Sequence, residues 1–259
     1  MDNKEAIDVF VDGSLGMASA AISIIRPTLS IAVLAIQPTV SIHLKKFLYK
    51  LAGENQITQR ECSRLENGIN GLTDTLQENA KNEKLRTDDL LERKQDGFCD
   101  ADDIFEDLIN SIKRDSESKK AKFYGNFIGN IPYSSDLNYS NLMQYSKVIS
   151  QLTYTELCLL HNFYKNYKDK SVDFGKAEIY VKRTEAPNAC ELLTEIIHMR
   201  NLGLLKNHPP YNLGETIGKV SLSFYGERLH ELMRLHLLDT KDTNRTLGEL
   251  WKITKYLSL

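Results

Sequence analysis

The stretch Met199-Arg200-Asn201-Leu202-Gly203-Leu204-Leu205 decides the fold class of this chain, together with the segment Lys219–Phe224 that follows it. Gly203 is typical of the left-handed residue that ends a helix, and Pro187 is typical of a first helical residue. Leu204-Leu205 and Lys219–Phe224 have the pattern of two short antiparallel strands. The loop between them contains two prolines and two glycines. The sequence therefore predicts a helix followed directly by a β-hairpin.

A second helix is predicted before this one, because Leu152-Thr153-Tyr154-Thr155-Glu156-Leu157 has the pattern of a helix start. Thr153 and Glu156 form a capping box, and Leu152 and Leu157 flank it as a hydrophobic staple. Two helices followed by a hairpin are the order of a winged helix-turn-helix. We therefore predict that residues 151–259 form a winged-helix-like domain with a C-terminal helix, in a chain that is mainly α-helical.

The N-terminal part, residues 1–98, is predicted to be a helical domain with an apolar hairpin. Between Ser14 and Leu44 the only charged residue is Arg26, and the basic residues Lys45 and Lys46 follow directly. Buried helices in a soluble core explain this composition, and so do a membrane segment and a partner-binding hairpin. The residues that carry this candidate membrane or partner segment are Arg26, Leu34, Ile36, Lys45 and Lys46.

A long helix is predicted from Thr58, because Thr58 and Glu61 form a second capping box, flanked by Ile57 and Cys62. Gly68 and Gly71 weaken such a helix by about 1 kcal/mol each relative to alanine, so its stability must come from packing. Packing within the chain is the first interpretation, and an intermolecular coiled coil is the alternative. The apolar stripe consists of Cys62, Leu65, Ile69, Leu72 and Leu76.

Residues 99–150 are predicted to form connecting helices. The charged stretch Lys84–Asp96 before them is interpreted as a solvated short helix or linker. The cluster Asp100–Asp103 is expected at the start of a helix, where carboxylates meet the positive end of the helix dipole, and not as a metal site. Apolar stripes at residues 104–112 and 121–131 predict two helices, separated by an exposed turn or hinge at 113–122.

The charge balance predicts no strong electrostatic attraction to nucleic acid, because the net charge is −2 and residues 151–259 contain 15 basic and 13 acidic residues. The four cysteines lack a CxxC pair and are interpreted as reduced thiols in a cytoplasmic protein. No phosphate-binding, nucleophile-elbow or dinucleotide motif is present in the sequence. We therefore expect a protein that is not an enzyme, with no catalytic residue, no cofactor and no metal site.

Candidate contacts for a partner or nucleic acid are the basic residues of the predicted winged helix: Lys182, Arg183, Arg200, Lys206, His208 and Lys219. The outward positions of its second helix also include Glu191 and Glu195, and carboxylates that face a major groove oppose DNA binding. We therefore predict a protein partner or a homo-oligomer. DNA binding by a winged-helix transcriptional regulator is the alternative function.

Three segments resemble the Abi-alpha group of bacterial proteins: Lys122–Asn130, Ile149–Leu160 and Met199–Leu205. They correspond to a central helix, a capped helix start and a helix end before a wing, within residues 100–238. Thr155 departs from the pattern, because the group favours an acidic residue there, and so do Gly125 and Gly129.

The Abi-alpha group is named for abortive infection, and its members are associated with phage defence or mobile elements. The resemblance implies a component of bacterial antiviral defence, and it transfers no catalytic residues. We predict that this component acts through protein–protein contacts, with conditional membrane contact by the apolar N-terminal segment.

Overall fold

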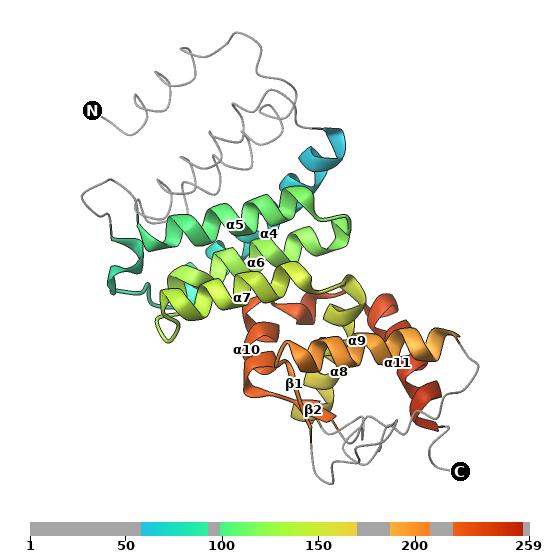
Figure 1. Cartoon of the computed structure of the whole chain (residues 1–259). Helices are drawn as coiled ribbons and strands as arrows, with labels where there is room; N and C mark the ends of the chain where they lie inside the picture. Colours follow the sequence, from blue (N-terminus) through green and yellow to red (C-terminus); the bar gives the residue numbers. More distant parts are fainter. Residues whose placement is uncertain (1–57, 93–98, 170–186, 208–219, 256–259) are drawn as a thin grey trace, which may run out of the picture. The chain divides into compact units, whose positions relative to one another are not determined.

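The computed structural model describes residues 58–92, 99–169, 187–207 and 220–255 (Figure 1). Within these ranges the chain is mainly α-helical, with eight α-helices and one two-stranded antiparallel sheet near the C-terminus. This confirms the predicted mainly α class with a small sheet. In this described part, no helix has the length and apolar character needed to cross a bilayer. The apolar segment Ser14–Leu44 lies outside the described residues.

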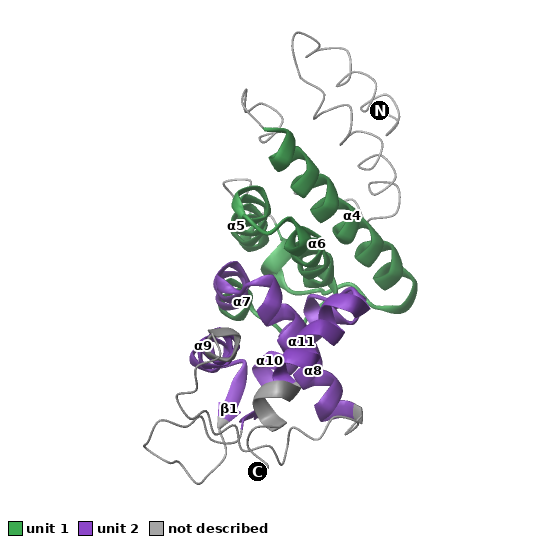
Figure 2. Cartoon of the chain, turned by 90° about the vertical axis from the view of Figure 1, so that its right-hand side faces the viewer, with its two compact units in different colours: residues 1–143 green, residues 144–259 purple. Residues whose placement is uncertain are grey.

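The chain divides into two compact units, residues 1–143 and 144–259 (Figure 2). The helix α7 (Tyr139–Gln151) runs across this division. The first unit contains α4 (Gln59–Asn82), α5 (Asp100–Arg114) and α6 (Ala121–Asn130).

The start of α4 is the capping box that the sequence predicts. The Glu61 N–H donates to Thr58 Oγ1 over 3.3 Å, and the Thr58 N–H donates to Glu61 Oε2 over 2.8 Å. The remainder of the stripe is buried at Leu65, Ile69, Leu72 and Leu76, whereas Cys62 is half-buried. Ile57, the predicted staple partner of Cys62, lies outside the described residues.

The helices α5 and α6 also agree with their apolar patterns. Asp102 accepts a hydrogen bond from the Cys99 N–H at 3.0 Å, so the acidic cluster caps the start of α5. The buried side chains are Ile104, Phe105, Leu108, Ile109 and Ile112 on α5, and Ala121, Phe123, Tyr124, Phe127 and Ile128 on α6. Both predicted stripes therefore face the core of the first unit.

The glycines of α4 and α6 lie where the two helices touch. A Cβ atom at Gly125 would lie 1.8 Å from the carbonyl oxygen of Gly68, and one at Gly71 would lie 2.3 Å from that of Lys122. A Cβ at Gly129 would lie 2.8 Å from the side chain of Thr75. These glycines therefore permit a contact of backbone against backbone, and this packing offsets their poor helix propensity.

Of the predicted solvated stretch Lys84–Asp96, the structure describes residues 84–92, where the charged residues Lys84, Asp88, Asp89 and Glu92 are exposed as predicted, but Arg86 is not. Arg86 is buried, and so are Leu90 and Leu91 of the 3₁₀ helix η1 (Asp89–Leu91). The Arg86 guanidinium donates to three backbone carbonyls after α6, those of Ile131, Ser134 and Leu137. These carbonyls belong to the segment that follows the end of α6, and the arginine fixes this segment, so it is part of the core.

The turn between α5 and α6 also contains a buried charge that the sequence pattern does not reveal. The 3₁₀ helix η2 (Ser118–Lys120) ends at Lys120, which is 3% exposed and forms an ion pair with Asp115. The Tyr124 hydroxyl donates to the same carboxylate over 2.8 Å. Burial acts to raise the pKa of Asp115, but these hydrogen bonds together outweigh it and hold that pKa below its ordinary value. The predicted turn is exposed at Ser116, Ser118 and Lys119, and it is anchored by the buried pair.

The second unit contains the end of α7 and the elements predicted from the deciding stretch. They are α8 (Tyr154–Asp169), α9 (Pro187–Asn201), β1 (Leu205–Asn207), β2 (Val220–Leu222), α10 (Phe224–Leu232), the 3₁₀ helix η4 (Leu235–Leu237) and α11 (Thr240–Lys255). The strands pair antiparallel, with Leu205 opposite Leu222 and Lys206 opposite Ser221. The Asn162 side chain donates to the carbonyl of Thr243 over 3.1 Å and so fixes α11 on α8.

The second strand is shorter than predicted, because Phe224 is not part of it. Phe224 is 81% exposed and is the first residue of α10. Ser223 ends the extended chain as the N-cap of α10, and its Oγ accepts from the Gly226 N–H over 2.9 Å. The apolar character of Phe224 continued the strand pattern in the sequence, but the serine cap decides the boundary.

Candidate interaction site

Two of the predicted contact residues lie in the described residues. Arg200 is half-buried in the last turn of α9, and Lys206 is exposed on β1. The other basic candidates, Lys182, Arg183, His208 and Lys219, lie outside the described residues, and so do Arg26, Leu34, Ile36, Lys45 and Lys46. The candidate interaction site is therefore built on α9 and the strand that follows it.

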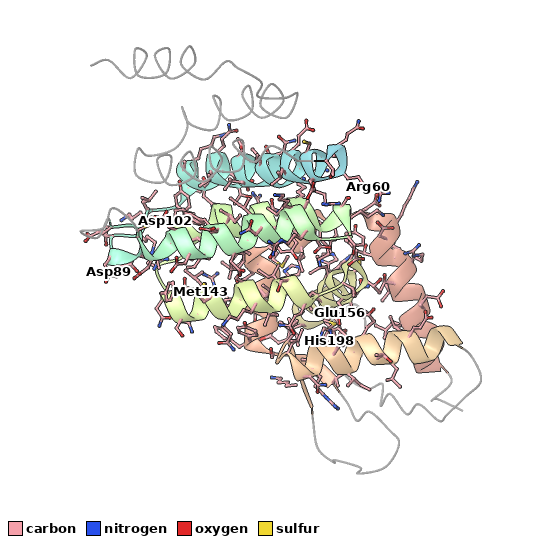
Figure 3. All side chains as sticks on the ribbon, turned by 45° about the horizontal axis from the view of Figure 1, so that its top comes forward. Arg60, Asp89, Asp102, Met143, Glu156 and His198 are labelled. Carbon is pink, nitrogen blue, oxygen red and sulfur yellow. The ribbon has the colours of Figure 1, made fainter. Side chains whose placement is uncertain are left out.

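The start of α8 supports α9 through a buried carboxylate. Glu156 is fully buried, and its Oε2 accepts from the Thr153 N–H over 2.8 Å, while the Glu156 N–H donates to Thr153 Oγ1 over 3.1 Å. This is the capping box predicted from the sequence. The other carboxylate oxygen of Glu156 accepts a hydrogen bond from Nδ1 of His198, on α9, over 2.6 Å (Figure 3). One side chain thus caps α8 and fixes α9.

A second carboxylate of α9 joins this cluster. Thr153 Oγ1 donates to Glu195 Oε2 over 3.0 Å. Burial raises the pKa of Glu195 to about 7, and the neighbouring Glu156 carboxylate acts in the same direction. Glu195 is half-buried, so the prediction that it is an outward carboxylate was wrong. The cluster of Thr153, Glu156, Glu195 and His198 instead joins the two helices.

The opposite face of α9 is polar and open to solvent. Glu191, Thr194 and Asn201 are exposed, whereas Leu192, Ile196 and Met199 are buried on the inner side. Leu193 and Ile197 are half-buried. In the described part of α9 the exposed face therefore combines an acid, a hydroxyl and an amide, and the cations of Arg200 and Lys206 lie at its C-terminal end.

The turn after α9 is fixed to α10. Gly203 has φ of 78°, as the predicted left-handed cap requires. Ser223 Oγ donates to the carbonyl of Gly203 over 2.6 Å, and a Cβ atom at Gly226 would lie 2.3 Å from the carbonyl oxygen of Leu204. The position of β1 relative to α9 therefore depends on the first turn of α10.

A pair of histidines joins α8 to α10. His161 Nδ1 lies 3.0 Å from His230 Nε2, and the Tyr164 ring stacks on His230 with 3.7 Å between ring centroids. His198 is not part of this pair, because its ring contacts Glu156. Among the described residues, no group of three or more His, Cys, Asp or Glu side chains is arranged to hold a metal ion.

Sequence reasoning did not find the histidine pair or the second carboxylate. The two histidines are 69 residues apart, and Thr153 and Glu195 are 42 residues apart. No local pattern links them, because each contact depends on how α8 packs against a later helix. Thr153 and Glu156 were found because their contact is local.

Comparison of the chain with protein-family models, with curated proteins and with solved structures found no match. The resemblance to the Abi-alpha group therefore stays a prediction from the three sequence segments.

Proposed function

We propose that this protein is a non-enzymatic component of bacterial anti-phage defence that acts by binding another protein through a winged-helix domain. Two helices, α8 and α9, followed by the β1–β2 hairpin are the element order that supports the winged-helix assignment. The resemblance of Lys122–Asn130, Ile149–Leu160 and Met199–Leu205 to the Abi-alpha group supports the role in defence.

The exposed face of α9 is the observation that favours a protein partner over DNA. A helix that enters a DNA groove needs cations and amides that face phosphates and base edges. Here Glu191 is exposed, and Thr194 follows one turn later. A mixed polar face of this kind suits a protein surface that offers complementary hydrogen bonds and a cation opposite Glu191.

The N-terminal apolar segment has a separate place in the proposal. Ser14–Leu44 has the composition of a segment that is buried within the protein, inserted in a membrane or bound to a partner. We propose that it is sequestered until the partner engages the winged helix. A second arrangement is a homo-oligomer formed through the winged helix or through Ser14–Leu44, and the cross-linking described below detects it.

A phage challenge with matched surface variants tests the proposal. The full chain is expressed in a bacterial host, and plaque numbers are compared for the wild type, Glu191→Lys and Asp74→Lys. Both residues are exposed acids, on α9 and on α4 respectively. The wild type and Asp74→Lys should reduce plaque numbers, and Glu191→Lys should not, at equal protein level.

Two outcomes oppose the proposal in different ways. If the wild type protects against no phage in a broad panel, the defence role fails. If Glu191→Lys protects as well as Asp74→Lys does, the α9 face is not the docking surface. Cross-linking of the wild type in protected cells identifies the partner, and alkaline washing of the membranes shows whether Ser14–Leu44 has been inserted.

A further inference from the structure

The histidine pair between α8 and α10 is an unusual contact, because it cannot form when both rings are protonated. The rings of His161 and His230 are nearly coplanar, with an angle of 10° between them, and two nitrogens face each other at 3.0 Å. A hydrogen bond at this distance needs one N–H and one bare nitrogen. If both rings carry two protons, two N–H groups face each other and the bond is lost.

Burial makes the protonation of both rings costly in free energy. His230 is 2% exposed, and its other ring nitrogen, Nδ1, is buried without a hydrogen-bond partner in the described part of the chain. No acceptor thus compensates a proton there. The Tyr164 ring covers His230, so water does not solvate a charge on that face.

The charged groups around the pair add to this cost. Lys165 and Lys168 of α8 and His236 of η4 act against a proton on the pair, as does His161 on His230. The carboxylates of Glu227 and Glu231 on α10 oppose them near Tyr164, but Lys168 already forms an ion pair with Glu227 at 2.6 Å. Burial is the largest cause, and it lowers the pKa of His161 to about 4 and that of His230 to about 3.

We propose that the His161–His230 contact is an acid-sensitive latch, which holds α10 on α8 while the pair is uncharged and releases α10 when both rings become protonated. The first turn of α10 also holds the turn after α9, through Ser223 and Gly203. Release of α10 therefore changes the support of the exposed α9 face. The latch is a property of the second unit, and it does not depend on the proposed role in defence.

The direction of the pH effect follows from the two states. Unfolded histidines have a pKa of about 6.5, so below this pH the unfolded chain binds protons that the folded pair does not bind. Stability is thus fully present above about pH 6.5 and is lost as the pH falls below it. A histidine that binds a proton only in the unfolded chain lowers the ratio of folded to unfolded protein about 8-fold between pH 6 and pH 5. The two histidines together therefore lower this ratio roughly 60-fold.

Substitutions that keep the geometry and remove the titration test the latch. In His161→Asn the amide nitrogen takes the place of Nδ1, and in His230→Gln the amide oxygen takes the place of Nε2, so a hydrogen bond from one side chain to the other is retained. Urea unfolding of the full chain at pH 6 and pH 5 should show that the double variant lacks the roughly 60-fold loss. His236→Gln removes an exposed histidine with a smaller effect on the pair, and it should keep most of the loss, because burial is the largest cause.

A second measurement separates the latch from a general loss of stability. Hydrogen exchange of the wild type, corrected for the intrinsic effect of pH, should become faster in α10 at pH 5 than at pH 7, relative to α5 in the first unit. In the double variant this difference should vanish. If the double variant does not fold, NMR titration of the two histidines in the wild type decides, because values near 6.5 for both overturn the proposal. Equal pH dependence of the wild type and a folded double variant overturns it as well.

Discussion

Glu156 shows how one residue sets the chemistry of its neighbours. It is fully buried, it caps α8, and it accepts a hydrogen bond from His198. Its charge also acts on Glu195, whose pKa of about 7 is raised first by burial and then by Glu156. A carboxyl whose pKa is raised on folding loses stability as the pH rises, here between about 4.5 and 7. This trend is opposite to that of the histidine pair.

Glu156→Gln should therefore lower the pKa of Glu195 without unfolding α8. Glutamine is accepted at this position of a capping box, but it carries no negative charge. We expect the pKa of Glu195 to fall from about 7 toward 4.5 and to stay above it, because burial remains. Carboxyl NMR titration of the folded protein measures this change directly.

Glu191→Gln is the control for this prediction, since Glu191 is an exposed carboxylate one turn earlier on α9. It should leave the pKa of Glu195 unchanged. A pKa of Glu195 that does not respond to Glu156→Gln would contradict the carboxylate contact between α8 and α9.

The residues that sequence alone identified correctly are those whose partners are local. Thr58 with Glu61 and Thr153 with Glu156 are both capping boxes three residues apart, and the pattern specifies the bond. Arg86 lay in a stretch that resembles a solvated linker, yet it binds carbonyls 45 to 51 residues away. A run of charged residues in the sequence does not show which basic side chain will be buried against the carbonyls that follow a helix.

At the scale of elements, the spacing of apolar residues predicts which face of each helix is buried, but it does not predict how closely two helices approach. Gly68 and Gly125 look like weak points in two helices when each is considered alone. Together they allow backbone contact between α4 and α6, where a Cβ at Gly125 would lie 1.8 Å from an oxygen of the other helix. The strand boundary at Ser223 is a similar case, because a side-chain cap overrides the apolar pattern at Phe224.

Gly125→Ala should destabilise the first unit by about 3 kcal/mol or more, because α4 and α6 must separate to admit the methyl group. Gly248→Ala is the matched control on α11, where a Cβ meets no atom within 4 Å. It should stabilise the protein by about 0.5–1 kcal/mol through helix propensity. Urea unfolding followed by circular dichroism measures both changes. Equal effects of the two substitutions would mean that α4 and α6 are not in backbone contact.

At the scale of the whole molecule, the distribution of charge decides between a protein partner and DNA. The net charge is −2 and the sequence pI is about 6.3, so no overall field attracts a polyanion. Binding to DNA would have to depend on the local cations. Of the six basic candidates around the predicted winged helix, five are lysine or arginine: Lys182, Arg183, Arg200, Lys206 and Lys219.

The full chain should therefore show little or no binding to a random duplex, and only a shallow salt dependence. If all five cations contacted phosphates, the logarithm of the association constant would fall with the logarithm of salt concentration with a slope of about −4.5. We expect a slope shallower than about −2, because two of the five cations, Arg200 and Lys206, lie beside the exposed face of α9 among the described residues, and the exposed carboxylate of Glu191 opposes them. Fluorescence anisotropy between 50 and 200 mM salt, on the order of the range where such binding responds strongly, measures it. Tight binding at low salt with the steeper slope, abolished by Arg200→Glu with Lys206→Glu, would establish a DNA-binding regulator instead.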